Sequence, residues 1–153
     1  MNATILLRAT LTDDVGVETV FSVPPGGATG QDYLTLSTTT KLAALASALS
    51  TTFDTATKGL VIVELKGATT TDYAISIGAN SGGSFGIDAG GMPAASTATL
   101  STTSPEIVYY DVDPGMTTVT VTPPAGRTCT PDYAVPSYEV DPGIGTQVSF
   151  SCD

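Results

Sequence analysis

The chain has 153 residues, of which fifteen are acidic and five are basic, so its formal net charge at neutral pH is −10. This charge would repel the phosphate backbone of a nucleic acid and an anionic membrane surface, which excludes nucleic-acid binding. Histidine and tryptophan are absent, so the commonest general base and transition-metal ligand is missing and enzymatic chemistry is not expected.

Residues 1–57 predict a hairpin followed by a helix. Two β-rich runs, ATILLRATL and GVETVFSV, flank the turn TDDV, and PPGG ends the second run. In LSTTTKLAALASALSTTF, apolar residues recur at helical spacing: Leu42, Leu45, Ala46, Leu49 and Phe53. This spacing predicts one short amphipathic helix over about residues 40–51, which packs its leucine face on the end of a sandwich.

From residue 58 onward the pattern is that of short strands and tight turns. GLVIVELK predicts a central strand because it is almost continuously apolar, and DYAISIG alternates inward Tyr73, Ile75 and Ile77 with small residues. Later runs such as PEIVYYDV, MTTVTVTP and TQVSFSC bring the total to about eight to ten strands, at the spacing of an antiparallel sandwich. The chain is therefore predicted to be mainly β, an antiparallel β-sandwich. Residues 1–57 are expected to pack on the sandwich domain, residues 58–153, as one compact unit.

One phrase occurs twice in the last third of the chain. YYDVDPGMTTVTV is followed by SYEVDPGIGTQVSF, and each copy places Asp-Pro-Gly between two β-rich runs. Proline presets the backbone for the second position of a turn, and glycine is free to adopt positive φ at the third. Both copies are therefore predicted to be hairpin corners: Asp113, Pro114, Gly115 and Asp141, Pro142, Gly143.

The two cysteines, Cys129 and Cys152, flank the second copy of this phrase. They are too far apart for a CxxC redox pair, and without histidine they cannot complete a four-ligand zinc site. A structural disulfide is expected, closing a loop of about 24 residues and contributing roughly 3 kcal/mol; a redox switch is the alternative.

A disulfide predicts an oxidising location, so the expected place is extracellular or on the cell surface, with this chain as the mature region of an exported protein. No apolar run approaches the about 18 residues that a spanning helix needs, so no membrane insertion of this segment is expected.

The passages GLVIVEL, YAISIGANSGGSF and EIVYYDVDPGMTTVTVTPPAGRTC, within about residues 58–130, resemble the carboxypeptidase regulatory-like, or prealbumin-like, β-sandwich domain of bacterial surface proteins. In that family a glycine-rich turn follows the first strand, and an aromatic-rich strand enters a VPPG corner before a TVTV strand. Here the corner is VDPG, residues 112–115. The resemblance implies an Ig-like or prealbumin-like β-sandwich, and a noncatalytic module of exported or surface proteins that spaces, binds or assembles.

Paired carboxylates are the candidates for binding a hard cation such as Ca²⁺. The pairs are Asp13 with Asp14, Asp111 with Asp113, and Glu139 with Asp141. The alternative is that these acids start turns by bonding their own backbone and keep strand edges soluble. Because no DxDxDG loop is present, no metal site is predicted. Serine chemistry lacks its histidine, and no S-x-x-K motif exists, so no catalytic residue and no cofactor are predicted either.

Tyr109 and Tyr110 are expected to point to opposite faces of their strand, which would leave one of them exposed for recognition or covering a sandwich end. Taken together, these patterns predict a noncatalytic extracellular structural or interaction module. Self-assembly on the cell surface or in a fibre is one form of it, and the partner is a protein, either a second copy or an envelope component, with a glycan as a further candidate. Two alternatives stay open: a glycan- or calcium-binding module using the loops of residues 80–91, and a virus decoration or tail structural protein.

Overall fold

The computed structural model describes residues 3–9, 14–23, 37–68, 72–87, 93–94, 106–133 and 135–153. Its first elements are β1 (Ala3–Ala9), β2 (Asp14–Val23), β3 (Ser37–Thr38), α1 (Thr39–Ala48), β4 (Gly59–Lys66), β5 (Ala74–Ile77), β6 (Gly83–Ile87) and β7 (Pro93–Ala94). They are followed by β8 (Glu106–Val112), β9 (Gly115–Thr117), β10 (Val119–Thr122), β11 (Cys129–Pro131), β12 (Tyr138–Val140) and β13 (Ile144–Cys152). The predicted class, mainly β with one short helix, is confirmed.

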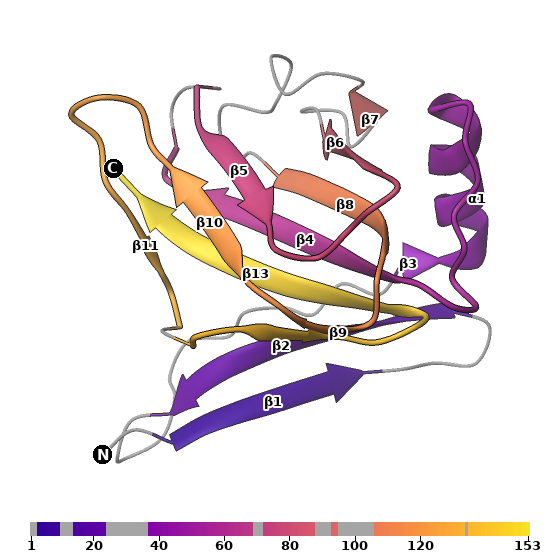
Figure 1. Cartoon of the computed structure of the whole chain (residues 1–153), viewed down its shortest axis with the longest axis horizontal. Helices are drawn as coiled ribbons and strands as arrows, with labels where there is room; N and C mark the ends of the chain where they lie inside the picture. The colour runs from indigo at the N-terminus through magenta and orange to yellow at the C-terminus, as the bar shows by residue number, and fades with distance from the viewer. Residues whose placement is uncertain are drawn as a thin grey trace.

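The largest sheet runs in the order β1-β2-β13-β4-β8-β6-β7 (Figure 1). The predicted hairpin at its edge is present, because β1 and β2 pair antiparallel from Ala3 opposite Val23 to Ala9 opposite Val17. The predicted central strand is present as well: β4 lies between β13 and β8, with one face fully buried at Val61, Val63 and Leu65 and the other face partly buried.

The sheet is mixed, because β13 pairs in parallel with both β2 and β4. The other strand pairs described are antiparallel, including those of β8 with β4 and β6. Along its last residues β13 also pairs with β11, beginning with Phe150 opposite Pro131. Apolar periodicity reports which face of a strand is buried but not which way its neighbour runs, so the two parallel pairs could not be predicted from it.

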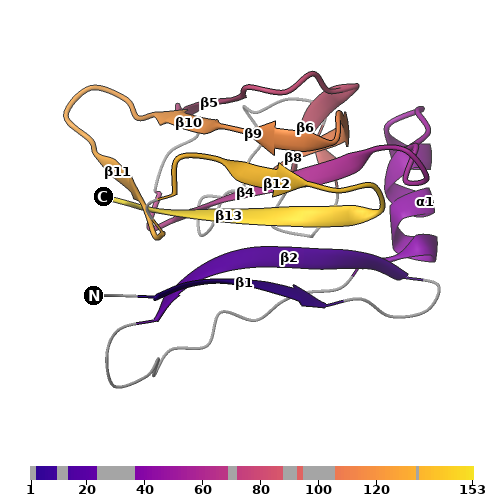
Figure 2. The same ribbon diagram turned by 60° about the horizontal axis from the view of Figure 1, so that its bottom comes forward.

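A second layer covers one face of the large sheet. It consists of two short ribbons, β5 with β10 and β9 with β12, which lie above β4, β8 and β13 in Figure 2. The residues buried between the layers come from alternate positions of the strands on both sides: Val61, Val63, Leu65, Ile107 and Val148 below, and Ile75, Ile77, Val119 and Val121 above. The second layer is therefore sandwich-like in its packing but is built from ribbons in place of one continuous sheet.

The helix packs against a second apolar cluster. Leu42 and Leu45 of α1 contact a group formed by Leu60, Phe85 and Val108, and these strand residues alternate with the ones that face the ribbons. The predicted leucine face is thus confirmed. Because β2 joins the same sheet as β13 and α1 shares this cluster with β4, β6 and β8, the described parts of residues 1–57 share the sheet and core of residues 58–153.

The helix ends in a Schellman motif. The N–H of Thr51 donates to the carbonyl of Ala46 at 2.9 Å, and the N–H of Ser50 donates to the carbonyl of Ser47 at 3.0 Å. Ser50 has a φ of 54°, the left-handed conformation that glycine normally supplies at this position. The motif stops α1 at Ala48, before the predicted end, and turns the chain sharply into residues 51–58.

Candidate functional site

Both Asp-Pro-Gly corners carry the chain from one layer to the other. The first lies between β8, which pairs with β4 and β6, and β9, which pairs with β12. The second lies between β12 and β13 and returns the chain to the large sheet. The prediction of hairpin corners is therefore wrong in one respect: the strands on either side of each corner do not pair with each other. Turn chemistry sets a change of direction, whereas the partner of each strand is set by tertiary packing.

The local geometry of the second corner agrees with its sequence. The N–H of Ile144 donates to the carbonyl of Asp141 at 3.2 Å, which closes a turn with Pro142 second and Gly143 third. Gly143 has a φ of 70°, as a glycine in that position allows. In the first corner Gly115 also has positive φ, 126°.

Pairing of β9 with β12 brings the two corners side by side, since Gly115 lies opposite Val140. Gly59 at the start of β4 fits beneath them. A Cβ atom on Gly59 would lie 2.6 Å from a methyl group of Val140 and 2.7 Å from the carbonyl oxygen of Asp141. The second corner can approach the sheet this closely because residue 59 has no side chain.

An ion pair lies beside the first corner. The ammonium of Lys58 donates to the carboxylate of Asp113, and the side-chain amide of Asn80 donates to the same carboxylate at 3.0 Å. The hydrogen bond from Lys58 is the largest cause that lowers the pKa of Asp113, and the hydrogen bond from Asn80 is the next. The bond between Lys58 and Asp113 also raises the pKa of Lys58. Because the two side chains are 35% and 42% exposed, solvent screens the pair and its main role is to orient the corner.

The loop of residues 51–58 is held against these corners. Asp111 has a φ of 50°, and its carboxylate accepts a hydrogen bond from the N–H of Asp54 at 2.6 Å. The N–H of Gly143 donates to the carbonyl of Lys58 at 3.0 Å. Loop position is therefore set from both corners, by Asp111 on one side and Gly143 on the other.

The acid pairs considered for Ca²⁺ are placed as follows. Asp111 and Asp113 bond to Asp54 and to Lys58 with Asn80, respectively, as described above. Glu139 is exposed on β12, and the side chains of Asp13 and Asp14 lie outside the described residues. Across the described ranges, no three carboxylates or cysteines group in a way that could hold a metal ion.

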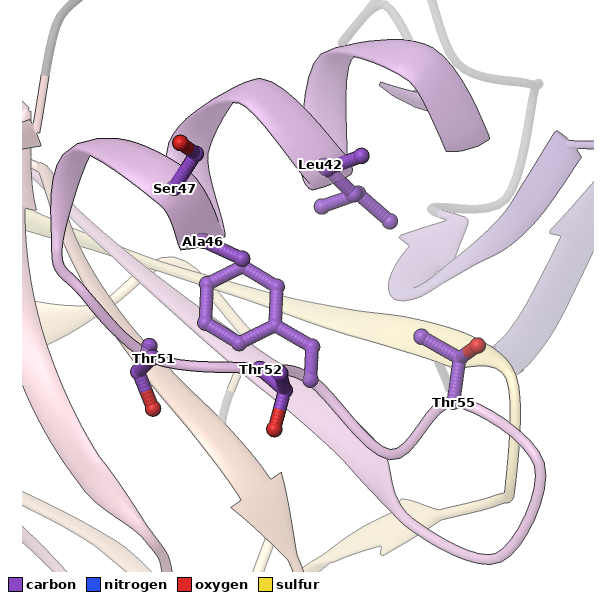
Figure 3. A pocket seen from close by; sticks show the side chains of 8 residues that line it. Leu42, Ala46, Ser47, Thr51, Thr52 and Thr55 are labelled. Carbon is purple, nitrogen blue, oxygen red and sulfur yellow. The ribbon is translucent and has the colours of Figure 1, made fainter.

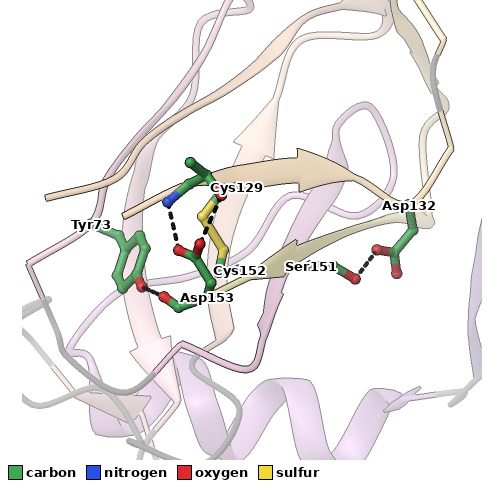
Figure 4. Close-up of a disulfide and its surroundings, with 7 residues drawn as sticks. Tyr73, Cys129, Asp132, Ser151, Cys152 and Asp153 are labelled. Atoms are coloured by element: carbon green, nitrogen blue, oxygen red, sulfur yellow. Dashed lines mark hydrogen bonds between the residues drawn. A yellow bond between two sulfur atoms is a disulfide. The ribbon is translucent and has the colours of Figure 1, made fainter. Parts of the chain in front are cut away.

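The two cysteines meet at the end of the molecule opposite α1 (Figure 1). Cys129 on β11 lies directly opposite Cys152 on β13, and the two form a disulfide (Figure 4). Next to it the carboxylate of Asp153 accepts hydrogen bonds from the backbone N–H of Thr128 at 2.6 Å and from its hydroxyl at 3.0 Å. These bonds, the backbone one first, lower the pKa of Asp153. The disulfide and the two hydrogen bonds from Thr128 to Asp153 fix β11, which has only three paired residues, to the edge of the sheet.

The expectation that Tyr109 or Tyr110 is exposed is wrong. Tyr109 faces the ribbons, is buried, and donates its hydroxyl to the carbonyl of Ile75 at 2.7 Å. Tyr110 is half-buried against the rings of Phe53 and Phe85. Strand alternation correctly placed the two tyrosines on opposite faces, but both faces of β8 are covered, one by the ribbons and the other by the cluster beneath α1.

A threonine-rich surface lies on the outside of the second layer. From Met116 to Thr122 the burial of successive residues alternates without a break, so that every second side chain faces solvent. We call the exposed set the outer threonine face: Met116, Thr118, Thr120 and Thr122, with Ala74 and Ser76 across the ribbon. Glu139 of β12 is exposed opposite Met116 and is the charged neighbour at that end of the face. Met116 is 65% exposed and is the largest apolar side chain in it. The alternating sequence MTTVTVT, residues 116–122, is the signal for this face, although the sequence analysis used it only to predict a strand.

A pocket of about 490 Å³ opens between α1 and the 51–58 loop (Figure 3). Its apolar lining comes from Leu42, Ala43, Ala46 and Phe53, and its hydroxyl groups come from Ser47, Thr51, Thr52 and Thr55. Sequence reasoning missed this pocket because the helix pattern indicates which residues face the core but not where a loop leaves that face uncovered.

Loops proposed for ligand binding, residues 80–91, are described in part; residues 88–91 lie outside the described ranges. Within those ranges, no helix is long and apolar enough to cross a membrane.

Comparison with protein-family models, with curated proteins and with solved structures gives no match for this chain.

Proposed function

We propose that the chain is a noncatalytic structural or interaction module that works outside the cell and meets its partner through the outer threonine face. The observation that carries this proposal is an exposed, threonine-rich sheet face with a single carboxylate, Glu139, at one end, on a protein whose net charge is −10. Like charges elsewhere on the surface oppose close approach, whereas the part of this face from Thr118 to Thr122 can be covered without burying a charge.

The partner that we propose is a second copy of the chain, with an envelope protein as the other candidate. The threonine hydroxyl and methyl groups of the outer threonine face suit sheet-on-sheet packing, and Met116 adds an adaptable apolar contact. The resemblance of residues 58–130 to carboxypeptidase regulatory-like domains of surface proteins supports the same role. The disulfide supports an oxidising location.

Sedimentation velocity over a range of protein concentrations tests the self-association. We expect the weight-average mass to rise with concentration for the wild type and to stay at the monomer value for Thr120→Glu, which places like charges in the middle of the face. Thr130→Glu is the matched control, because it adds the same charge to an exposed strand threonine on β11, away from this face. A wild type that stays monomeric throughout, or two variants that behave alike, would exclude this face as the self-association surface.

Salt provides an independent check of the same idea. Two copies that each carry a charge of −10 repel one another, and the Debye length falls from about 30 Å at 0.01 M salt to about 8 Å at 0.15 M. Self-association is therefore expected to strengthen as salt is added. Association that weakens with salt would indicate contacts between opposite charges instead of packing of the outer threonine face.

The location is tested by intact mass on protein purified from its native source and alkylated before and after reduction. Cysteines that take up label only after reduction support an exported module. Two thiols that label without reduction would favour assembly in the cytosol, as a virus decoration or tail protein requires.

A further inference from the structure

The pocket beside α1 has walls that are held in place without a ligand. On the helix side, Leu42 anchors α1 in the cluster that contains Leu60, Phe85 and Val108. On the loop side, the Schellman motif positions Thr51, and the bond from Asp54 to Asp111 fixes the segment that follows it. A cavity with preset walls binds a ligand with a smaller entropic cost than one that must form on binding.

Its space comes from small side chains. Ala43 and Ala46 line the pocket on the helix side, at positions where a leucine side chain would fill part of it. Figure 3 shows Ala46 facing the loop residues Thr51 and Thr52 across the opening. The volume, about 490 Å³, lies within the range of roughly 300–1,000 Å³ that is typical of small-molecule sites. The pocket is therefore of a size for one small molecule.

The chemistry of the lining selects the kind of molecule. None of the described residues that line the pocket is charged, and more of the pocket surface is apolar than polar. A charged ligand would lose its hydration here without gaining a partner. Each threonine hydroxyl can donate one hydrogen bond and accept two, so a ligand with polar groups at one end can be satisfied at the rim.

The nearest acid does not change this conclusion. Asp54 lies between two pocket residues in the sequence, but its carboxylate accepts hydrogen bonds from Ala56 and Thr57 of its own loop. The bond from the Thr57 hydroxyl, the largest contribution, lowers the pKa of Asp54, so the carboxylate stays ionised and bonded within the loop.

We propose that this pocket binds an uncharged, mainly apolar small molecule that carries one or two hydrogen-bonding groups. Such binding is separate from the outer threonine face, which lies on the ribbon layer, whereas the pocket lies beside α1. Loss of one activity would therefore leave the other intact.

The test uses two fluorescent probes that share one aromatic framework, neutral N-phenylnaphthylamine and anionic anilinonaphthalene sulfonate, titrated into the full chain. We expect saturable binding of the neutral probe at one site per chain and binding of the anionic probe that is at least about tenfold weaker. Equal or tighter binding of the anionic probe would overturn the proposed ligand class. No saturable binding of the neutral probe would overturn the site.

Ala43→Leu locates the binding site. Ala43 is exposed and lines the pocket, so leucine fills the cavity without disturbing the core, and the affinity for the neutral probe should fall by at least about tenfold. Ala44→Leu is the matched control, since Ala44 is also exposed in α1 but does not line the pocket. Circular dichroism confirms that both variants fold. If the two variants bind the probe equally, the probe binds elsewhere and the proposal is wrong.

Discussion

The disulfide is expected to supply a large share of the stability of this chain, and its removal is the most quantitative test of the fold. Cys129 and Cys152 are 23 residues apart in the sequence, and the loop-entropy relation for a separation of this size gives about 3 kcal/mol at 25 °C. In the double variant Cys129→Ala/Cys152→Ala, the free energy of unfolding should fall by that amount. A typical domain is stable by only about 5–15 kcal/mol, so the loss is large enough to measure.

The assay is equilibrium unfolding in urea, followed by tyrosine fluorescence and by circular dichroism, because the chain has six tyrosines and no tryptophan. Wild type measured in reductant is the control, because it removes the cross-link without changing a side chain. We expect the two reduced forms to agree and both to lie about 3 kcal/mol below the oxidised wild type. A loss below about 1 kcal/mol would refute the reasoning, since the cross-link would then not restrict the unfolded chain as that relation requires.

Three further outcomes follow from particular residues. Ser50→Gly should raise the free energy of unfolding by up to about 1 kcal/mol in urea titration, because Ser50 has positive φ in the cap of α1; a loss would contradict that conformation. Gly59→Ala should lower it by about 1–3 kcal/mol, since the new methyl group meets Val140 and the backbone of Asp141; an unchanged value would mean that the second corner does not approach β4 this closely. Burial raises the pKa of Tyr109; above about pH 10 the unfolded state therefore loses a proton that the folded state retains, and urea midpoints should fall as pH rises, less steeply in Tyr109→Phe.

Much of the fold follows from local signals. The hairpin of β1 and β2, the central position of β4 and the buried face of α1 were predicted because each depends on periodicity within one segment. The disulfide was predicted from the number and spacing of the cysteines.

The pairing partners of the strands could not be predicted from such local patterns. The two Asp-Pro-Gly segments form turns, as their composition indicates, but β8, β9, β12 and β13 choose partners by packing in three dimensions. The two parallel neighbours of β13 arise between segments that are far apart in the chain. The pocket depends on the position of a loop held by Asp111 and Gly143, and neither residue carries a sequence signal for that role.

The most direct measurement of the proposed function is the oxidation rate of Met116 in hydroxyl-radical footprinting at low and at high protein concentration, normalised to a methionine reference peptide. Met116 is 65% exposed at one end of the outer threonine face, so covering this face with a second copy must slow its oxidation. We predict a rate that falls as concentration rises in the wild type and that stays constant in Thr120→Glu. A wild-type rate that is independent of concentration would contradict self-association through this face.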